Sequence, residues 1–389
     1  IAPEVISMRT AFAKFGVILP LVAALAACAT TSTSKAPIAP AASAVPVAYG
    51  HVDVSRRPPG DADGYRPPLK VGVLLPLSGG LAVAATPVRD GFMAGYYNER
   101  RRRPEVHFYD SSIGANAAYA KAVADGADYV VGPLGREGVT ELFAKDGLKV
   151  PVLALNQSDA KTPAGSLSFA LSPEDEAEAI AQAQLSSGIH KAVVIAGGDA
   201  IQKRAAAAFI TYFNGHGGKA APAVTNGDAF GEEVQKAAQS LGGAEGVFLA
   251  LKGDQIVALA PKLAASPVAN ARRFASSQIQ LGIGKGDDSA LDGIVFPTEA
   301  WNVRKTALAP SASSLATLSP TARGAASKLF AFGYDAWLIT AYPEHLNGGR
   351  EGGVRGATGD LHVDRNGNIV RVPGWSVFRQ GQPVPLAER

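Results

Sequence analysis

Small polar residues and glycines recur where predicted buried strands end, and groups of this kind can hold an anion. Ser78, Gly79 and Gly80 follow the apolar run 70–76 and precede a predicted helix. A glycine-containing turn at the start of a helix leaves backbone N–H groups free, and such groups attract anions. The alternative interpretation is a tight turn that needs glycine for its dihedral angles.

Other small or polar residues end the following strands in the first half of the chain. Because the carboxyl ends of parallel strands meet at one edge of a sheet, these residues should cluster with Ser78 and form a ligand site. Turn and cap chemistry is the competing interpretation, since serine and asparagine favour such places anyway. The expected cluster comprises Ser111, Ser112, Gly132, Asn156 and Ser158.

Four charged residues could face this cluster from the second half of the chain or from a hinge. Each of them, taken alone, also fits a helix cap or a surface charge. They are Asp199, Lys252, Glu299 and Asp335.

The sequence lacks the motifs of nucleophilic catalysis, nucleotide binding and metal binding. The chain has no Gly-x-Ser-x-Gly or Walker sequence, and the glycines of 282–286 lack dinucleotide-binding spacing. None of the six histidines has helical ligand spacing with another histidine or with the cysteine. Asp364, Asn366 and Asn368 mimic the start of a calcium loop, but its twelfth position is Trp375. We therefore expect no enzyme, no cofactor and no metal.

The first 27 residues have the pattern of an export signal. Met8 is the expected translation start, which makes 1–7 upstream sequence. Two basic residues then precede the apolar run 15–25. That run is too short to span a membrane, which takes about 20 residues, and it fits a signal peptide.

The only cysteine, Cys28, follows directly. Ala26 and Ala27 are small enough for the extended chain to enter a peptidase, and the thiol of Cys28 can accept a diacylglyceryl group. The motif resembles the bacterial lipobox, which implies a lipid-anchored protein. Ala29, where aspartate would suggest retention in the inner membrane, favours the outer membrane. A plain secretory signal with a chance cysteine is the alternative.

Residues 28–68 should form a lipidated, disordered tether, because they are rich in alanine, proline, serine and threonine. A tether of about 40 residues at roughly 3.1 Å each would reach at most ~120 Å.

The composition is that of an ordinary globular chain. Its 389 residues are 47% hydrophobic and 18% charged, with a net charge of +3. Part of the positive excess is the run Arg100–Arg103, so no broad nucleic-acid face is implied. This run should lie at the carboxyl end of a helix, where positive charges interact favourably with the helix dipole. Contact with an anionic surface is the alternative.

Strand and helix patterns alternate in two successive blocks from Lys70 onward. Such alternation requires parallel sheets with helices on both faces, and two blocks indicate two similar lobes. The strands expected first are 70–76, 105–109, 128–131, 150–155 and 167–171. The second block has strands 191–196, 220–224, 246–251, 273–275 and 293–297, a long helix 321–342, a hairpin 361–370 and a last strand 377–379.

Several stretches of the sequence resemble a known protein family. The stretches 71–80 and 89–96, with Val131–Leu134 and Pro151–Asn156, resemble type I periplasmic binding proteins, as does the closing hairpin at 359–368. Joined to a lipobox, the chain is most similar to the LppC-type penicillin-binding-protein activators, over roughly 69–387. Known members carry a helical-repeat domain before this part. The tether alone precedes it here, which indicates a short form.

The resemblance implies two Rossmann-like lobes with a hinge. We expect lobe 1 at 69–170 and 298–345, and lobe 2 at 171–297 and 346–387. The implied function is a lipid-anchored periplasmic regulator that binds and activates a class A penicillin-binding protein, with no nucleic acid as partner. The alternative is a solute-binding lipoprotein for an amino-acid-like ligand held in the cleft.

Overall fold

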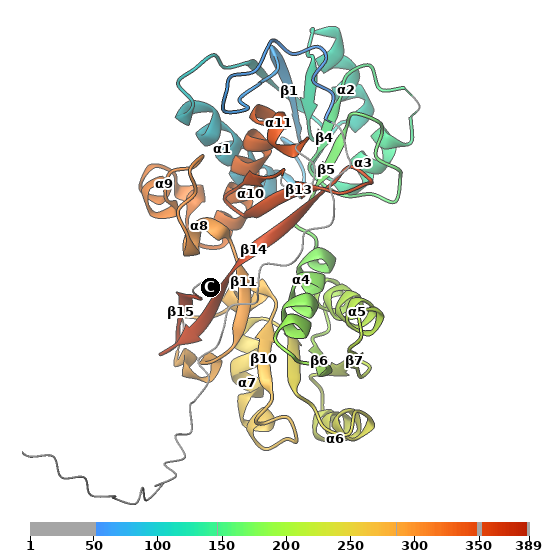
Figure 1. Cartoon of the computed structure of the whole chain (residues 1–389), viewed down its shortest axis with the longest axis vertical. Helices are drawn as coiled ribbons and strands as arrows, with labels where there is room; N and C mark the ends of the chain where they lie inside the picture. Colours follow the sequence, from blue (N-terminus) through green and yellow to red (C-terminus); the bar gives the residue numbers. More distant parts are fainter. Residues whose placement is uncertain (1–51, 146, 285, 348–351, 387–389) are drawn as a thin grey trace, which may run out of the picture. The chain divides into compact units, whose positions relative to one another are not determined.

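A computed structural model describes residues 52–145, 147–284, 286–347 and 352–386. The expected signal peptide and Cys28 lie outside the described residues. Within this part, strands and helices alternate as expected, and two mostly parallel sheets form (Figure 1). The α/β class is therefore confirmed, whereas the hinge stays a prediction.

The first sheet has the strand order β2-β1-β3-β4-β5, followed by β14. The first five strands are parallel, and their order reverses between β1 and β3. In sheets of this kind, ligands bind outside the carboxyl ends of the strands at the reversal. The strands are β1 (Lys70–Leu75), β2 (Glu105–Asp110), β3 (Tyr129–Val131), β4 (Val152–Ala154) and β5 (Leu167–Phe169).

The second sheet repeats this order along the chain, as β7-β6-β9-β10-β11, with β8 also paired to β6. The expected strand 220–224 is two short pieces, β7 and β8, which flank Pro222, a residue without a backbone N–H to donate. The strands are β6 (Lys191–Ala196), β7 (Lys219–Ala220), β8 (Val224–Thr225), β9 (Gly246–Ala250), β10 (Arg272–Ala275) and β11 (Val295–Thr298).

One long strand, β14 (Asn368–Arg379), belongs to both sheets. Its start pairs with β5 and with β13 (Gly359–Val363), and its end pairs with β11 and with β15 (Gln382–Pro385). The expected turn at 366–367 between β13 and β14 is confirmed, with Gly367 at a φ of 80°. The expected last strand 377–379 is the end of β14.

Residues 346–387 were expected in the second lobe, and this prediction is wrong for the first part of the segment. Both β12 (Val354–Arg355) and β13 pair within the first sheet. Their buried side chains Leu361 and Val363 pack in the same core cluster as those of β1 and β3. A hydrophobic alternation in sequence indicates a strand but not which of two sheets it joins.

Helices flank both sheets. The expected long helix 321–342 is interrupted, because short 3₁₀ turns at 320–322 and 324–326 precede α10. The main helices are α1 (Ala82–Asn98), α2 (Ala115–Ala124), α3 (Arg136–Phe143), α4 (Pro173–Ser186), α5 (Ala200–Gly215), α6 (Phe230–Ser240), α7 (Gly253–Ala264) and α10 (Ser327–Ala341); shorter ones are α8 (Ala300–Val303), α9 (Ala312–Leu318) and α11 (Pro343–Leu346).

Glycines let α1 and α10 approach closely. A Cβ added to Gly91 would lie 1.9 Å from the carbonyl oxygen of Phe330, and one added to Gly333 would lie 2.0 Å from that of Val88. No side chain fits at either contact. The buried faces of the two helices, including the edge-to-face pair Phe92 and Trp337, thereby join the core of the first sheet.

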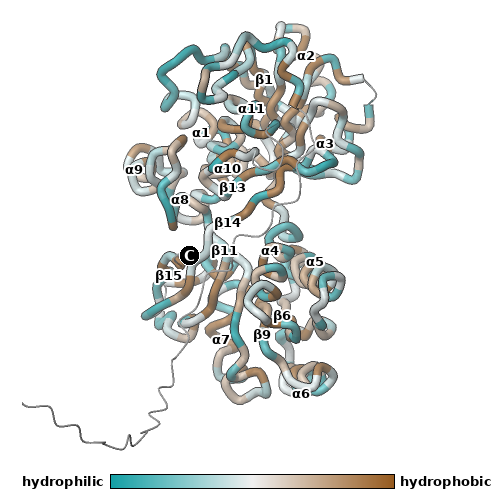
Figure 2. The backbone as a smooth tube through the Cα atoms, viewed as in Figure 1, coloured by the Kyte–Doolittle hydropathy of each residue, from teal (hydrophilic) through white to brown (hydrophobic). Residues whose placement is uncertain are grey.

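Buried strands and the helices packed on them together supply the core around each sheet, with α10 contributing to the first. Hydrophobic colour in Figure 2 accordingly lies on interior strands and helices, while many outer turns are hydrophilic. Among the described residues, no helix is long and apolar enough to cross a membrane.

Residues 52–68 are folded onto the body, so the expected tether is wrong for this stretch, which we call the strap. Val52, Arg57 and Tyr65 are buried. Arg57 donates hydrogen bonds to the carbonyl oxygens of Arg66 and Thr340 and lies over the ring of Tyr129. Composition alone predicted disorder here. A few large side chains nevertheless bury enough surface to hold this proline-rich segment against the body.

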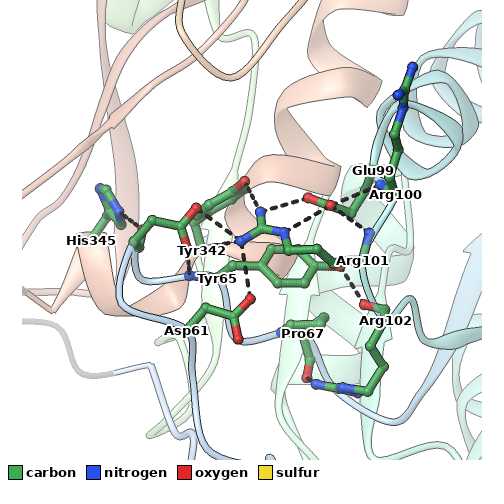
Figure 3. Close-up of polar contacts among 10 residues, drawn as sticks. Asp61, Tyr65, Pro67, Glu99, Arg100, Arg101, Arg102, Tyr342 and His345 are labelled. Atoms are coloured by element: carbon green, nitrogen blue, oxygen red, sulfur yellow. Dashed lines mark hydrogen bonds and ion pairs between the residues drawn. The ribbon is translucent and has the colours of Figure 1, made fainter.

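Arg101 holds the strap in place (Figure 3). Its guanidinium forms ion pairs with Asp61 (3.1 Å) and Asp63 (2.9 Å) in the strap, and with Glu99 (2.8 Å) after α1. It also lies 4.0 Å from the ring centre of Tyr65. Arg102 adds hydrogen bonds to the carbonyls of 67 and 68. The arginine run therefore serves as an internal clamp rather than as a simple helix end.

Candidate functional site

The residues predicted for the first cluster do lie at the carboxyl edge of the first sheet, and Asp110 organises them. Its carboxylate accepts hydrogen bonds from the N–H of Leu77 (3.0 Å), the N–H of Ser112 (2.9 Å) and the hydroxyl of Ser112 (2.5 Å). These bonds, led by the Ser112 hydroxyl, lower the pKa of Asp110 below its usual range. Asp110 thus fixes the turns after β1 and β2 against each other and keeps a negative charge there.

Ser78 and Ser112 contact each other, with their hydroxyl oxygens 2.8 Å apart. Ser111 donates its N–H to the carbonyl of Leu75. Gly79 has a φ of 76°, which explains the glycine, whereas Gly80 has an ordinary φ and nothing within 4 Å of an added Cβ. The turn is therefore open at Gly80, and its two hydroxyls satisfy one another.

The remaining members of this cluster carry out turn chemistry. An added Cβ on Gly132 would lie 2.1 Å from the carbonyl oxygen of Leu74, so glycine is needed for close packing. Asn156 donates to the carbonyl of Leu134, and Ser158 exchanges hydrogen bonds with the backbone of Ala160. Ligand contact by these residues stays a prediction.

Asp199 and Lys252 lie at the carboxyl edge of the second sheet. Asp199 caps α5 by accepting the N–H of Gln202 at 2.8 Å, and Lys252 precedes α7. The two side chains form an ion pair at 3.5 Å and are both partly exposed. The opposite charges of Asp199 and Lys252 therefore compensate each other. Asp199 is also a helix cap, which was the alternative interpretation of this residue.

Glu299 and Asp335 occupy the interior, which corrects the expectation that they face an open cluster. Glu299 accepts a hydrogen bond from Asn302 at the start of α8. Asp335, in α10, accepts the N–H of Ala357, the N–H of Thr358 and the hydroxyl of Thr358 at 2.5–2.8 Å. Burial raises the pKa of Asp335 to about 7 in spite of these donors. Sequence pattern could not separate these two from surface acids.

A buried carboxylate that carries no sequence motif, Glu176, connects α4 with α10 and β14. It pairs with Lys328 at 2.9 Å, accepts the N–H and hydroxyl of Ser277, and lies 4.0 Å from Arg371. Burial favours a raised pKa, but Lys328 and Arg371 hold the pKa of Glu176 below its usual value. The charge is thus retained inside the protein.

The carboxyl edge of the first sheet also exposes large apolar side chains, which the sequence pattern does not distinguish from core residues. Leu77, Leu81 and Val83 lie on the turn after β1 and the first turn of α1, and Ile113 follows Ser112. The side chain of Leu81 reaches Gly135, after β3. These four residues, which we call the edge surface, surround the reversal point of the sheet.

No group of three or more histidine, cysteine or acidic side chains suited to a metal occurs within the described ranges. The arrangement of charges instead consists of internal pairs, caps and clamps, as described above.

Comparison with known families decides the relationship. The family model described as "LppC putative lipoprotein" matches residues 64–226 and 223–381. The chain belongs to the LppC family. The match begins inside the strap and extends through β14, so it takes in both sheets.

Curated relatives of this LppC-family chain are named "Penicillin-binding protein activator LpoA". The protein from Photobacterium profundum is 25% identical over 354 residues, covering 82% of this chain and 57% of the relative. The one from Klebsiella pneumoniae is 26% identical, covering 73% of this chain and 45% of the relative. The chain spans about half the length of these relatives.

Solved structures agree on the fold. The C-domain of Haemophilus influenzae LpoA, described as a regulator of PBP1A, superposes with a TM-score of 0.69 at 23% identity, covering 82% of this chain and all 100% of that domain. A putative branched-chain amino acid ABC transporter protein from Chromobacterium violaceum gives 0.59 at 27% identity, covering 80% and 100%. The fold is that of periplasmic binding proteins.

Proposed function

We propose that this chain is a lipid-anchored periplasmic regulator that binds and activates a class A penicillin-binding protein and so stimulates peptidoglycan synthesis. The observation that carries the proposal is the LppC-family match over both sheets, together with relatives named as penicillin-binding protein activators. Those names denote activation of another protein's activity, and we assign no catalytic step to this chain itself.

The anchor in this proposal is Cys28, acylated after the export signal, with the outer membrane as its destination. Two or three acyl chains would hold the protein stably, where one would be marginal. Support comes from the lipobox-like sequence 25–28, from Ala29, and from the word lipoprotein in the family's description. Metabolic labelling with a tritiated fatty acid should mark the wild type and leave Cys28→Ser unlabelled, and fractionation should follow the label.

Amino-acid binding is the second candidate, because a transporter protein shares the fold. The carboxyl edge of the first sheet gives it weak support. Ser78 and Ser112 bond to each other, and Asp110 keeps a negative charge beside them. An incoming α-carboxylate would meet that charge, whereas an activator requires no such ligand.

Binding and stimulation of a synthase test the proposal directly. Purified full-length protein in detergent is mixed with each class A penicillin-binding protein of the same cell, and glycan polymerisation and cross-linking are followed with lipid II as substrate. We expect binding to at least one synthase and a several-fold increase in product. If the protein neither binds nor stimulates any of them, the proposed function fails.

A thermal shift series separates the second candidate. A ligand present at 100 times its dissociation constant adds about 2.7 kcal/mol to the free energy of unfolding. Amino acids and muropeptides should leave the midpoint unchanged if the protein is a regulator. A clear upward shift with any amino acid would favour the solute receptor.

A further inference from the structure

The described residues form two bodies, one around each sheet, with separate apolar cores. Buried side chains around the first sheet belong to two clusters, and those around the second sheet belong to two others. Among the described elements, only β14 contributes side chains to clusters of both sheets. A common apolar core therefore does not fix the first body against the second.

The chain passes between the bodies three times within the described residues. The passages lie at 170–172, 297–299 and 370–374, and Figure 1 shows the last of them as the middle of β14. A few residues between elements can absorb a change in backbone angles, so relative motion of two such bodies is the ordinary expectation. The residues that mark each passage, by their core clusters, are Phe169 and Ala177, Phe296 and Trp301, and Ile369 and Trp375.

Four polar side chains, two from each body, contact one another beside these passages. From the second body come Glu176, on α4, and Ser277, which follows β10. From the first body come Lys328, near the start of α10, and Arg371, on the part of β14 that pairs with β13. We call these four residues the latch.

The contacts of the latch form a closed triangle. Lys328 Nζ donates to Glu176 Oε2 at 2.9 Å and to the hydroxyl of Ser277 at 2.7 Å. That hydroxyl donates to Glu176 Oε2 at 2.8 Å, and the N–H of Ser277 donates to Oε1 at 2.7 Å. The guanidinium of Arg371 lies 4.0 Å from the same carboxylate. The second body thus engages both carboxylate oxygens, and the first body brings two positive charges to them.

Such contacts depend strongly on how the bodies are placed. Hydrophobic burial has no direction, whereas charge-assisted hydrogen bonds are short and have a defined geometry. A displacement of a few ångströms would separate Lys328 from both of its acceptors, and an ion pair at a buried carboxylate is costly to break. Another contact between the bodies acts in the same sense, because Gln157, after β4, donates to Asp175 on α4 at 3.3 Å.

We infer that the latch holds the two bodies in one fixed arrangement, so that the hinge expected between them does not move while Lys328 and Glu176 are paired. Binding proteins of this fold take up a solute by closing two bodies around it. A latched molecule instead keeps one constant surface for another protein, and it loses less conformational freedom on binding. The inference does not depend on the proposed function, because it concerns movement within this chain alone.

The distance between two spin labels, one on each body, tests the latch. Ala120 on α2 and Ala207 on α5 are both exposed, so each is replaced by a cysteine and labelled. The full chain also carries Cys28→Ser, which leaves the two introduced thiols as its only ones. Pulsed electron paramagnetic resonance then gives the distribution of distances between the labels.

The labelled chain is compared with Lys328→Met and with Lys328→Met combined with Glu176→Gln. The combined variant removes both charges of the pair, so it provides folded protein even if the single variant is unstable. We expect one narrow distance with the latch intact and a distribution at least twofold wider in both variants. The matched control is Arg204→Met, which removes an exposed pair with Glu174 inside the second body and should leave the width unchanged.

Four results would overturn the latch. The first is an unchanged width in the combined variant. The second is widening in Lys328→Met alone, because an unpaired buried charge would then be the cause. The third is equal widening in Arg204→Met, and the fourth is a distribution that is already broad with the latch intact. The synthase assay has no bearing on these results, so failure of the proposed function and failure of the latch are separate outcomes.

Discussion

Lys328 Nζ lies 2.9 Å from Glu176 Oε2, and this ion pair connects α10 with α4. The Glu176 side chain is 7% exposed and also faces Arg371 and Ser277. A carboxylate in such a place needs its partners, because a buried charge without compensation is strongly unfavourable. The pair therefore connects an element of the first half of the chain with one of the second through opposite charges.

Replacing Lys328 by methionine should destabilise the protein by roughly 3 kcal/mol, since it leaves the buried Glu176 carboxylate with Arg371, 4.0 Å away, as its remaining cation. Adding Glu176→Gln to Lys328→Met should recover part of the loss. Equilibrium urea unfolding measures both. The control is Arg204→Met, which removes an exposed pair with Glu174 and should cost about 1 kcal/mol or less. Equal losses in the two methionine variants would contradict this account.

Asp335 should make stability depend on pH. Burial raises its pKa to about 7 in the folded protein, against 3.8 as its ordinary value. The folded state then binds the extra proton between these values, so this group's contribution to stability falls as pH rises from about 4 to 7 and is constant above. The slope is at most about 1.4 kcal/mol per pH unit.

Comparison with Asp335→Asn isolates that contribution. The variant is less stable overall, because its amide brings a donor towards the N–H groups of 357 and 358. The difference in unfolding free energy between wild type and variant should shrink from pH 5 to pH 7. A difference that does not vary with pH would mean that Asp335 is ionised throughout this range.

Arg101→Ala should release the strap. Its ion pairs with Asp61 and Asp63 and its contact with Tyr65 are lost together. We expect cleavage before Asp61 and Asp63 by an aspartate-directed protease to become at least tenfold faster. Arg100→Ala is the matched control, because its guanidinium points away from the cluster in Figure 3. Similar cleavage of both variants would show that other contacts hold the strap.

Gly333→Ala should destabilise the protein by about 2–3 kcal/mol, because the new methyl group meets the carbonyl of Val88 and forces α1 and α10 apart. The control is Gly231→Ala in α6, where nothing lies within 4 Å of the added Cβ. There alanine should add up to about 1 kcal/mol of stability through helix propensity. Thermal or urea unfolding measures the stability of both variants. If close helix packing is the cause, stability should fall in Gly333→Ala and rise in Gly231→Ala.

The alternation of strands and helices could be predicted because buried parallel strands read as continuous apolar runs such as 70–76 and 191–196. The pairing of β13 with the first sheet could not be predicted. The alternation of apolar residues at Leu361 and Val363 is equally compatible with a strand in either sheet. The strap escaped prediction for a related reason. Its burial depends on Arg57 and Tyr65 finding partners far along the chain, at Thr340 and Arg102.

The candidate site was predictable in position but not in role. Strand-end residues such as Ser112 do gather at one edge, because parallel topology places them there. Whether they face a ligand or each other depends on distances of a few ångströms, as between Ser78 and Ser112. The apolar exposure of Val83 and Ile113 was invisible in sequence, where such residues indicate a core.

The strap also changes how a tethered body explores its surroundings. With anchoring at Cys28, about 24 residues join the lipid to the fold at Val52, with a contour length of roughly 75 Å instead of ~120 Å. Effective concentration between tethered partners falls roughly as the −3/2 power of linker length, so this shortening raises it about twofold. Under the proposed anchoring at Cys28, the arginine clamp at Arg101, 73 positions further along the chain, would thus set the local concentration at which the body meets a tethered partner.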